Sequence, residues 1–446
     1  MSKQEAIQLS DHFSCGRLLR FTAPSIVMMI FTSIYGVVDG FFVSNFVGKT
    51  PFAAVNFIFP FLMILGAVGF MFGTGGSALV SMKMGEKKPE EANRIFSMLI
   101  YVSIGVGAVI TVLGLLCIRP VAAALGAEGQ MLEDSVTYGS VILLGMPAYV
   151  LQMEFQSFFI TAEKPQLGLW VTVGSGVTNM VLDWLLVGVL SLDLVGAAAA
   201  TVSSQVIGGC LPLLYFGRKN AAPLRLCKTV FDGRALLRTC TNGSSELMSN
   251  ISMSLVSMLY NIQLLRFAGE NGVAAYGTMM YVNMVFLAAF IGYSIGSAPV
   301  VGFHFGAQNH RELQSLLRKS LGIIGVFALC MLAAGYLLAA PLSSMFVGYD
   351  AALYRLTVDG FYIFALSFLF AGFAIFFSGF FTALNDGLTS ALISFLRTLV
   401  FQIAAVLLLP LLWGIDGIWW SIVVAEAMAV FAGIFFLLLK RKKYHY

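Results

Sequence analysis

Polar side chains interrupt two long apolar stretches of the sequence at spacings that bring them to one level. Asn179 and Asp183 are four residues apart, so a helix places them on one face. Leu192 lies at the apex of a short turn, nine residues after Asp183 and nine before Thr201. At about 1.5 Å per residue, both side chains lie roughly 13–14 Å below the turn, near the middle of a bilayer about 30 Å thick. An ionisable group at that depth is costly and indicates a functional site.

Asp39 places a second carboxylate at the same depth, because it stands ten residues before the polar turn at Lys49. The four groups offer two carboxylates, an amide oxygen and a hydroxyl oxygen. Such oxygens suit Na⁺, a hard cation. They also suit a proton, because two neighbouring carboxylates in a medium of low dielectric constant are not both charged at low cost. The alternative is that the four groups only satisfy one another inside a packed bundle.

Further ionisable residues lie within apolar stretches. Glu246 and Glu154 both fall in the half of the bilayer on the side where the N-terminus lies. Each is a candidate to bind a cationic substrate or a second proton. Their alternative role is hydrogen bonding to neighbouring helices. Arg397 and Glu426 fall near the middle of two later stretches, and we expect them to form a buried structural ion pair, because an unpaired arginine there is very costly.

The helix that carries Asp39 contains residues that favour bending. Pro24 removes one backbone hydrogen bond and clashes with the preceding turn, and Gly36 and Gly40 flank the aspartate. A bendable helix with a titratable carboxylate can act as a switch. A static kink is the alternative interpretation.

The composition indicates an all-α protein that crosses a membrane many times. Hydrophobic residues make up 59% of the 446 residues and charged residues 11%, with a mean hydropathy of +0.89, whereas soluble domains have about 25% charged residues. The polar N-terminus does not resemble a secretory signal. The six cysteines and four histidines form neither Cys-x-x-Cys nor His-Glu-x-x-His, which disfavours a zinc enzyme. The net charge of +4 gives no indication of nucleic-acid binding.

The apolar stretches predict twelve transmembrane helices. They cover residues 17–45, 52–82, 95–118, 134–160, 166–190, 194–217, 239–266, 273–303, 317–339, 353–382, 387–412 and 415–439. With the N-terminus inside, 21 of the 26 Lys and Arg residues fall in inner segments. The excess of positive charge on the cytoplasmic side predicts that both termini are cytoplasmic and that the chain is a multi-pass protein of the plasma membrane.

The two halves of the sequence repeat each other. A shift of 221 residues aligns Gly75 with Gly296 and Gly85 with Gly306, almost without gaps over 46–205. Six helices per half predict two lobes related by a pseudo-two-fold axis along the membrane normal, with a binding site at or near their interface. We expect an N-terminal lobe at 1–217, a basic cytoplasmic linker at 218–238 and a C-terminal lobe at 239–446.

The repeat also shows where the halves differ. Asp39, Asn179, Asp183 and Thr201 align with Tyr260, Val400, Ala404 and Ile422. Polar groups that serve only the scaffold tend to occur in both halves. A set that occurs in one half alone therefore indicates a site.

These features resemble the multidrug and toxic compound extrusion (MATE) family, and its prokaryotic members in particular. The resemblance covers all twelve predicted helices and rests on Pro24, on Val38-Asp39-Gly40, and on Asn179-x-x-x-Asp183 followed by Gly196-Ala197-Ala198-Ala199-Ala200-Thr201. It implies two six-helix lobes around a central cavity, a cation site at Asp39, Asn179, Asp183 and Thr201, and bending of the first helix coupled to ion binding. It also associates an acidic residue of the seventh helix with ion coupling in some members, a region that contains Glu246.

The resemblance implies a transporter rather than an enzyme. We expect it to export hydrophobic or cationic small molecules, with a role in antibiotic resistance, by antiport with Na⁺ or H⁺ through alternating access. We expect no cofactor beyond the coupling ion, no nucleic-acid partner and a monomer in the bilayer. The alternative function is a flippase for lipids or lipid-linked oligosaccharides, which predicts a basic groove for phosphates inside the membrane. The sequence offers only Arg397 for that purpose, with Glu426 as its expected partner.

Overall fold

The computed structural model describes residues 7–47, 49–348 and 350–446, and in these ranges the chain is helical and contains no strand. Among the described residues, nine helices are long and apolar enough to cross a membrane, and two bent helix pairs bring the number to eleven. The 74-residue α8 counts once in that number, although non-helical backbone at Gly269 (φ 62°, ψ −152°) divides it into two helices. Gly269 adopts this positive φ without the penalty that a side chain would add. The twelve predicted spans and the multi-pass membrane fold are therefore confirmed.

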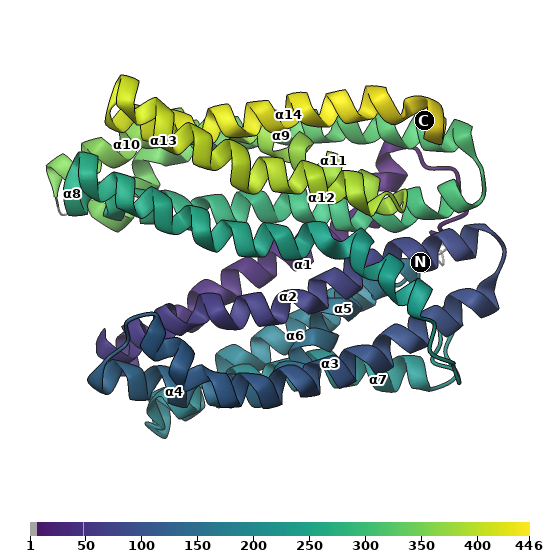
Figure 1. The fold of residues 1–446 in the computed structure, drawn as a ribbon, viewed down its shortest axis with the longest axis horizontal. Helices are drawn as coiled ribbons and strands as arrows, with labels where there is room; N and C mark the ends of the chain where they lie inside the picture. The colour runs from purple at the N-terminus through teal and green to yellow at the C-terminus, as the bar shows by residue number, and fades with distance from the viewer. Residues whose placement is uncertain (1–6, 48, 349) are drawn as a thin grey trace, which may run out of the picture.

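The elements follow the predicted spans in order. They are α1 (Cys15–Phe42), η1 (Val43–Val47), α2 (Lys49–Gly85), α3 (Pro89–Ala124), α4 (Gly129–Leu144), α5 (Met146–Thr161), α6 (Pro165–Asp183), η2 (Trp184–Val189), α7 (Asp193–Gly217), α8 (Gly233–Gly306), α9 (His310–Val347), α10 (Ala351–Ala365), α11 (Phe368–Ala383), α12 (Gly387–Phe395), η3 (Leu396–Val400), α13 (Phe401–Trp413) and α14 (Ile415–Tyr444). The three η elements are short π-helical turns within spans. The chain doubles back within α8, and both termini lie toward the same end of the bundle (Figure 1).

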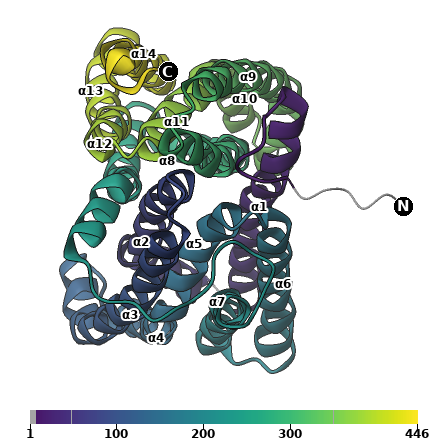
Figure 2. The same cartoon turned by 90° about the vertical axis from the view of Figure 1, so that its right-hand side faces the viewer.

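The backbone repeats with the period that the sequence shows. The positive-φ residues Lys87 and Asp193 have counterparts at Gln308 and Gly414, each 221 residues later. The break between α4 and α5 at Gly145 likewise corresponds to the break between α10 and α11. Figure 2 shows the outcome, with α2 to α7 in one group of helices and α8 to α14 in the other. The two pseudo-symmetric lobes expected from the repeat are present.

Three details differ from the predicted helix boundaries. The spans predicted at 134–160 and 353–382 are bent pairs, with angles of 58° between α4 and α5 and 48° between α10 and α11. Pro147 at the start of α5 contributes to the first bend, because it has no N–H to continue the preceding helix. The linker predicted at 218–238 is shorter, since α8 begins at Gly233. The Asp232 side chain starts α8 by accepting hydrogen bonds from the N–H groups of Arg234 and Ala235, at 3.0 and 3.1 Å.

Glycines bring the two lobes into direct backbone contact at the end where the termini lie. A Cβ added to Gly85 at the end of α2 would lie 2.0 Å from the Phe303 carbonyl oxygen of α8. One added to Gly306 would lie 2.0 Å from the Met82 carbonyl oxygen of α2. Gly85 and Gly306 are partners in the sequence repeat, so this crossing lies on the pseudo-two-fold axis. The repeated glycines therefore form one of the close backbone contacts of the lobe interface, together with Gly75 and Gly243 farther along α2 and α8.

The N-terminal segment crosses the same end and contacts both lobes. The Leu9 N–H donates to the Glu163 carboxylate, between α5 and α6, at 2.7 Å. The Phe13 N–H donates to Glu312 of α9 at 2.9 Å, and His12 Nδ1 lies 2.6 Å from the other oxygen of that carboxylate. Burial raises the pKa of Glu163, although the hydrogen bond from Leu9 opposes the rise. Leu9 and Phe13 are fully buried, so the segment is part of the packing that closes this end.

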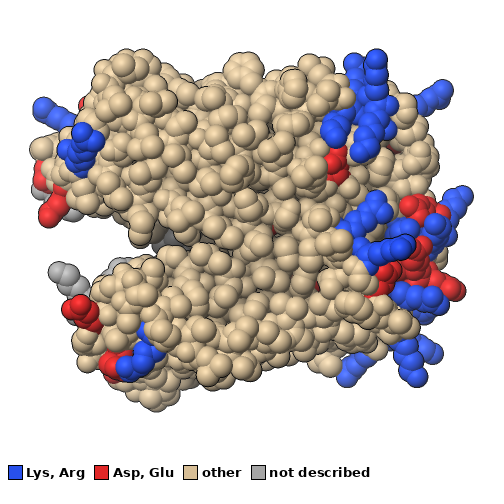
Figure 3. Space-filling model, viewed as in Figure 1, with Lys and Arg blue, Asp and Glu red and all other residues tan. Residues whose placement is uncertain are grey.

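The opposite end of the molecule is open. Figure 3 shows a hollow between the two lobes at the end away from the termini, and continuous packing at the other end. Lys and Arg side chains gather at the closed end (Figure 3). Two residues with a part in the predicted topology and repeat lie outside the described residues: Lys3, one of the 21 basic residues of the inner segments, and Gly48, within the repeat at 46–205.

The Gly85 contact predicts a specific intolerance. Gly85→Ala should destabilise the closed end by about 1–3 kcal/mol, because the new methyl group overlaps backbone that a side-chain rotation does not move. Gly322→Ala is the matched control, since a Cβ there meets nothing within 4 Å. Thermal unfolding of the two purified variants in detergent checks this, and an equal melting temperature for both would contradict the proposed close contact.

Candidate functional site

Three helices of the N-terminal lobe position the four residues selected from the sequence. Asp39 lies near the end of α1, Asn179 and Asp183 lie in the last turns of α6, and Thr201 lies in the third turn of α7. α6 packs against both other helices. The chain turns into π-helix four residues after Asp39, at η1, and immediately after Asp183, at η2. Such π turns within helices occur frequently at functional sites.

The structure brings the four side chains together. The Asp39 carboxylate lies within interaction distance of Asp183, Asn179 and Thr201. Asn179 is 1% exposed and Asp183 is fully buried, while Asp39 and Thr201 are half-buried, so the α6 side of the cluster lies inside the lobe. The side chains that residue counts place at one depth in the membrane are therefore also neighbours in the structure.

Several polar atoms of the cluster have no hydrogen-bond partner. They include both carboxylate oxygens of Asp183, both polar atoms of the Asn179 amide and Oδ1 of Asp39. In the described part of the chain, no Lys, Arg or His forms an ion pair with either aspartate. Buried polar atoms are normally paired, and a buried charge without a partner is strongly unfavourable. The chain thus provides a set of buried oxygens whose charge it does not itself neutralise.

The Thr201 hydroxyl is oriented as an acceptor toward the cluster. Its proton is donated to the Ala197 carbonyl oxygen of the preceding turn, at 3.1 Å. A hydroxyl whose proton is engaged in this way has oxygen lone pairs available for a cation or for a protonated carboxyl group. Together with the Asn179 amide oxygen and the two carboxylates, it forms a donor set that fits Na⁺ or a proton.

Sequence reasoning missed a fifth member of this cluster. Tyr138, which is 3% exposed on α4, lies close to Thr201 and within electrostatic range of both Asp39 and Asp183. Its phenol supplies a hydrogen-bond group from a fourth helix. No spacing signal links Tyr138 to the other residues, because its position depends on how α4 packs against α7.

The C-terminal lobe has different chemistry at the equivalent positions. Tyr260, the counterpart of Asp39, is buried and donates its hydroxyl to Gln402 Oε1 at 2.7 Å. Arg397 of η3 forms two hydrogen bonds to Glu426 of α14, from Nε at 2.8 Å and from Nη2 at 2.9 Å. The expected ion pair is therefore present, and its forked geometry is the strong form of an arginine–carboxylate contact.

The two glutamates considered as second sites have unlike surroundings. Glu246 of α8 is partly buried and lies within electrostatic range of Arg397. In the described structure the two residues do not form an ion pair, because Arg397 is paired with Glu426. Glu154 of α5 is fully buried beside Ser103 of α3, and both of its carboxylate oxygens lack a hydrogen-bond partner. Neither glutamate joins the Asp39 cluster, so a role for either stays a prediction.

The residues of α1 that favour bending lie along the segment from Pro24, which is near the C-terminal lobe, to Gly40, which follows Asp39. α1 continues as one helix through Pro24, which is buried. The turn around Pro24 faces the C-terminal lobe, because a Cβ added to Gly292 of α8 would lie 2.6 Å from Ile26 Cα. Gly36 has open space around its Cα, and Gly40 lies in α1 at a position whose surroundings are outside the description. The same helix thus contacts one lobe near Pro24 and carries Asp39 in the other.

A family model matches each half of the repeat. The model described as MatE matches the chain twice, over residues 24–185 and 247–408. The two matches cover more than half of the chain and fall one in each lobe. The chain belongs to the MatE family. The first match contains Asp39, Asn179 and Asp183, and this is the MATE family that the sequence motifs resemble.

Relatives and solved structures are similar to the chain over nearly its whole length. Multidrug export protein MepA of Staphylococcus haemolyticus is 25% identical over 430 residues, covering 96% of this chain and 94% of the relative. MepA of Staphylococcus aureus strain MRSA252 is 23% identical over 428 residues with the same coverage. A structure described as the outward-facing conformation of a multidrug resistance MATE family transporter has a TM-score of 0.93 at 22% identity, covering 100% of both chains. A structure described as MATE in the bent conformation has a TM-score of 0.90 and covers 99% of this chain and 98% of the other.

The Arg397–Glu426 pair predicts a reciprocal effect on stability. Glu426→Gln should lower stability by about 3–5 kcal/mol, because it leaves a guanidinium buried without its counter-charge. The double variant Arg397→Gln/Glu426→Gln should recover most of that loss. Folded yield by size-exclusion chromatography and the melting temperature in detergent check both statements. A double variant no more stable than Glu426→Gln would contradict pairing as the role of these residues.

Proposed function

We propose that this MatE protein is a multidrug efflux transporter that exports hydrophobic or cationic small molecules in exchange for Na⁺ or H⁺. One observation carries the proposal: Asp39, Asn179, Asp183 and Thr201 converge inside the N-terminal lobe, with polar atoms that the chain leaves unpartnered. The names of the MepA relatives support the substrate class. The donor set fits both Na⁺ and H⁺, and we propose one of these two as the coupling ion.

The residues of this chain supply the means of coupling. A cation held by Asp39 and Asp183, with neutral oxygens from Asn179 and Thr201, neutralises charge that is costly inside the lobe. Asp39 belongs to the same helix as Pro24, where one backbone hydrogen bond is missing and the helix faces the other lobe. Binding at Asp39 therefore biases the shape of α1. Antiport requires that cation and substrate prefer different conformations, and a bendable helix shared by both lobes provides the two conformations.

The charge distribution supports an orientation with both termini in the cytoplasm of a plasma membrane. The closed end carries most of the basic residues (Figure 3), which favours the cytoplasmic side. The hollow between the lobes then opens outward, in a state competent to release substrate. Opening inward requires the contacts of Gly85 with α8 and of Leu9 with Glu163 to separate. A monomer suffices for this mechanism, because the site and both lobes belong to one chain.

The ion pair in the C-terminal lobe favours efflux of small molecules over the flippase alternative. A lipid phosphate passing between the lobes requires basic side chains at mid-membrane depth. Arg397 is engaged in two hydrogen bonds with Glu426 and is 15% exposed, so it is not free to bind a phosphate.

Charge neutralisation of the aspartates should uncouple transport. Asp39→Asn and Asp183→Asn should each reduce cation-driven dye transport in proteoliposomes by roughly 100-fold, because each removes a charged ligand worth on the order of 3 kcal/mol. Glu133→Gln, at an exposed position on α4, is the control and should transport normally. An imposed Na⁺ gradient and an imposed pH gradient, applied separately, identify the coupling ion. Undiminished cation-driven transport by both Asn variants would refute the site.

The orientation of the Thr201 hydroxyl gives a finer test. Thr201→Val keeps the shape but removes the oxygen, and it should raise the cation concentration for half-maximal transport by about tenfold, the loss expected for one hydrogen-bonding or ligating oxygen. Thr201→Ser keeps the oxygen and should behave nearly as the wild type. Transport measured against Na⁺ concentration and against pH provides the readout. Equal curves for the Val and Ser variants would show that the hydroxyl contributes no ligand.

A further inference from the structure

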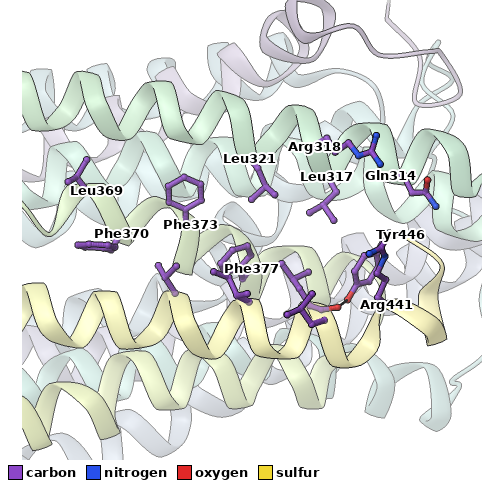
Figure 4. Close-up of a pocket in the computed structure, with 14 residues that line it drawn as sticks. Gln314, Leu317, Arg318, Leu321, Leu369, Phe370, Phe373, Phe377, Arg441 and Tyr446 are labelled. Atoms are coloured by element: carbon purple, nitrogen blue, oxygen red, sulfur yellow. Dashed lines mark hydrogen bonds between the residues drawn. The ribbon is translucent and has the colours of Figure 1, made fainter.

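The outer wall of the C-terminal lobe has a groove that takes no part in the proposed antiport. It lies between α9 and α14, with α11 as its floor, and encloses about 660 Å³ (Figure 4), within the roughly 300–1,000 Å³ of ligand pockets. In Figure 2, α9 and α14 lie at the edge of the molecule away from α2 to α7, so the groove faces the surrounding membrane and not the space between the lobes.

The groove is amphipathic along the membrane normal. Leu369, Phe370 and Phe373 line one end, and Arg318 and Arg441 lie at the other (Figure 4). That second end is the one at which the chain terminates and basic residues gather. Neither guanidinium forms an ion pair in the described structure, and no acidic residue lines the groove. Two unpaired guanidinium groups above an apolar channel complement an anion that has a hydrocarbon tail.

The length of the groove matches one leaflet. Arg441 and Val430 are eleven residues apart on α14, which is about 16 Å of helix. Half of a bilayer core is about 15 Å. A molecule with its head at the arginines therefore reaches the bilayer midplane with its tail beside Val430 and Phe373.

The sequence repeat shows that the equivalent groove of the N-terminal lobe is filled by the chain itself. Ser97 is the counterpart of Arg318, and its hydroxyl accepts a hydrogen bond from the Cys227 N–H of the linker at 2.9 Å. The carbonyl oxygen of Phe216, the counterpart of Leu437, accepts the Leu226 N–H at 2.9 Å. Leu224 of the linker is fully buried in that lobe. The linker thus covers the groove of the N-terminal lobe and leaves the groove of the C-terminal lobe uncovered.

In the C-terminal lobe, the chain covers only the end of the groove that contains Arg318 and Arg441. The Tyr446 hydroxyl donates to the Leu437 carbonyl oxygen at 2.9 Å, the position that the linker occupies in the other lobe. The apolar remainder of the groove is lined by side chains such as Ile434, which is 41% exposed.

We propose that this groove binds one anionic phospholipid of the leaflet at the closed end of the transporter, with its phosphate between Arg318 and Arg441 and an acyl chain along α11. Basic pockets between transmembrane helices on the cytoplasmic side bind anionic headgroups in this manner. The lipid takes the place in the C-terminal lobe that the linker takes in the N-terminal lobe. It bridges α9 and α14 and is not transported.

Native mass spectrometry of the purified full chain, with phosphatidylglycerol or phosphatidylcholine of identical acyl chains, tests the headgroup. One phosphatidylglycerol should remain bound per chain, with phosphatidylcholine retained about tenfold less. Arg318→Gln/Arg441→Gln should reduce phosphatidylglycerol retention by about tenfold or more, as expected for loss of charge-assisted hydrogen bonds to phosphate. Arg225→Gln/Arg234→Gln removes the same charge from exposed positions near the linker and should retain the lipid like the wild type.

A second pair of variants tests the tail and remains informative if the arginine variant does not fold. Ile434→Trp fills the apolar part of the groove and should reduce retention of both lipids. Phe431→Trp changes an exposed residue of the same helix outside the groove and should leave retention unchanged. Equal retention of the two lipids, or unchanged retention by the Arg318/Arg441 or Ile434 variant, would overturn the proposal. A dimer that the arginine variant abolishes would assign the groove to a second copy of the chain instead, and would also overturn it.

Discussion

The dominant physical constraint on this protein is a pair of aspartates in an apolar lobe, one fully buried and one half-buried, without a basic partner. Asp39 and Asp183 are not paired with a Lys, Arg or His in the described structure, although neutral oxygens surround them. In lipid, water does not supply the missing counter-charge. The proposed coupling site rests on this imbalance, because a bound proton or cation would supply the missing charge.

The two lobes meet the same requirement in opposite ways. In the C-terminal lobe, Arg397 and Glu426 form a forked ion pair and Tyr260 donates to Gln402, although Glu246 has no ion-pair partner among the described residues. The N-terminal lobe leaves its carboxylates open. The positions of Asp39 and Asp183 thus carry unpaired carboxylates in one repeat and uncharged side chains in the other, and α1 with Pro24 connects the two lobes. This difference is the reason that we propose one ion site and not two.

The repeat also organises the surfaces where the lobes meet each other and the membrane. Gly85 and Gly306 pair across the pseudo-two-fold axis because backbone must approach backbone there. On the outer wall the symmetry fails, because residues 218–232 connect the lobes once and cover only the N-terminal one. The proposed lipid groove at Arg318 and Arg441 is a consequence of that asymmetry.

The sequence by itself determined the elements and their depth. Long apolar stretches leave the backbone no alternative to helices in a bilayer, and residue counts from the polar turns place Asp39, Asp183 and Thr201 at one level. The 221-residue repeat determined the two lobes and showed which polar residues lack a counterpart.

Only the tertiary structure decided which helix faces meet, because lateral packing has no local signature in the sequence. It added Tyr138 of α4 to the aspartate cluster and brought Glu246 within electrostatic range of Arg397. It also bent two spans that the sequence predicts as continuous, and it placed Arg318 and Arg441 at the same end of one groove. Each of these depends on side chains from distant segments filling one shared volume, which spacing along a single helix does not specify.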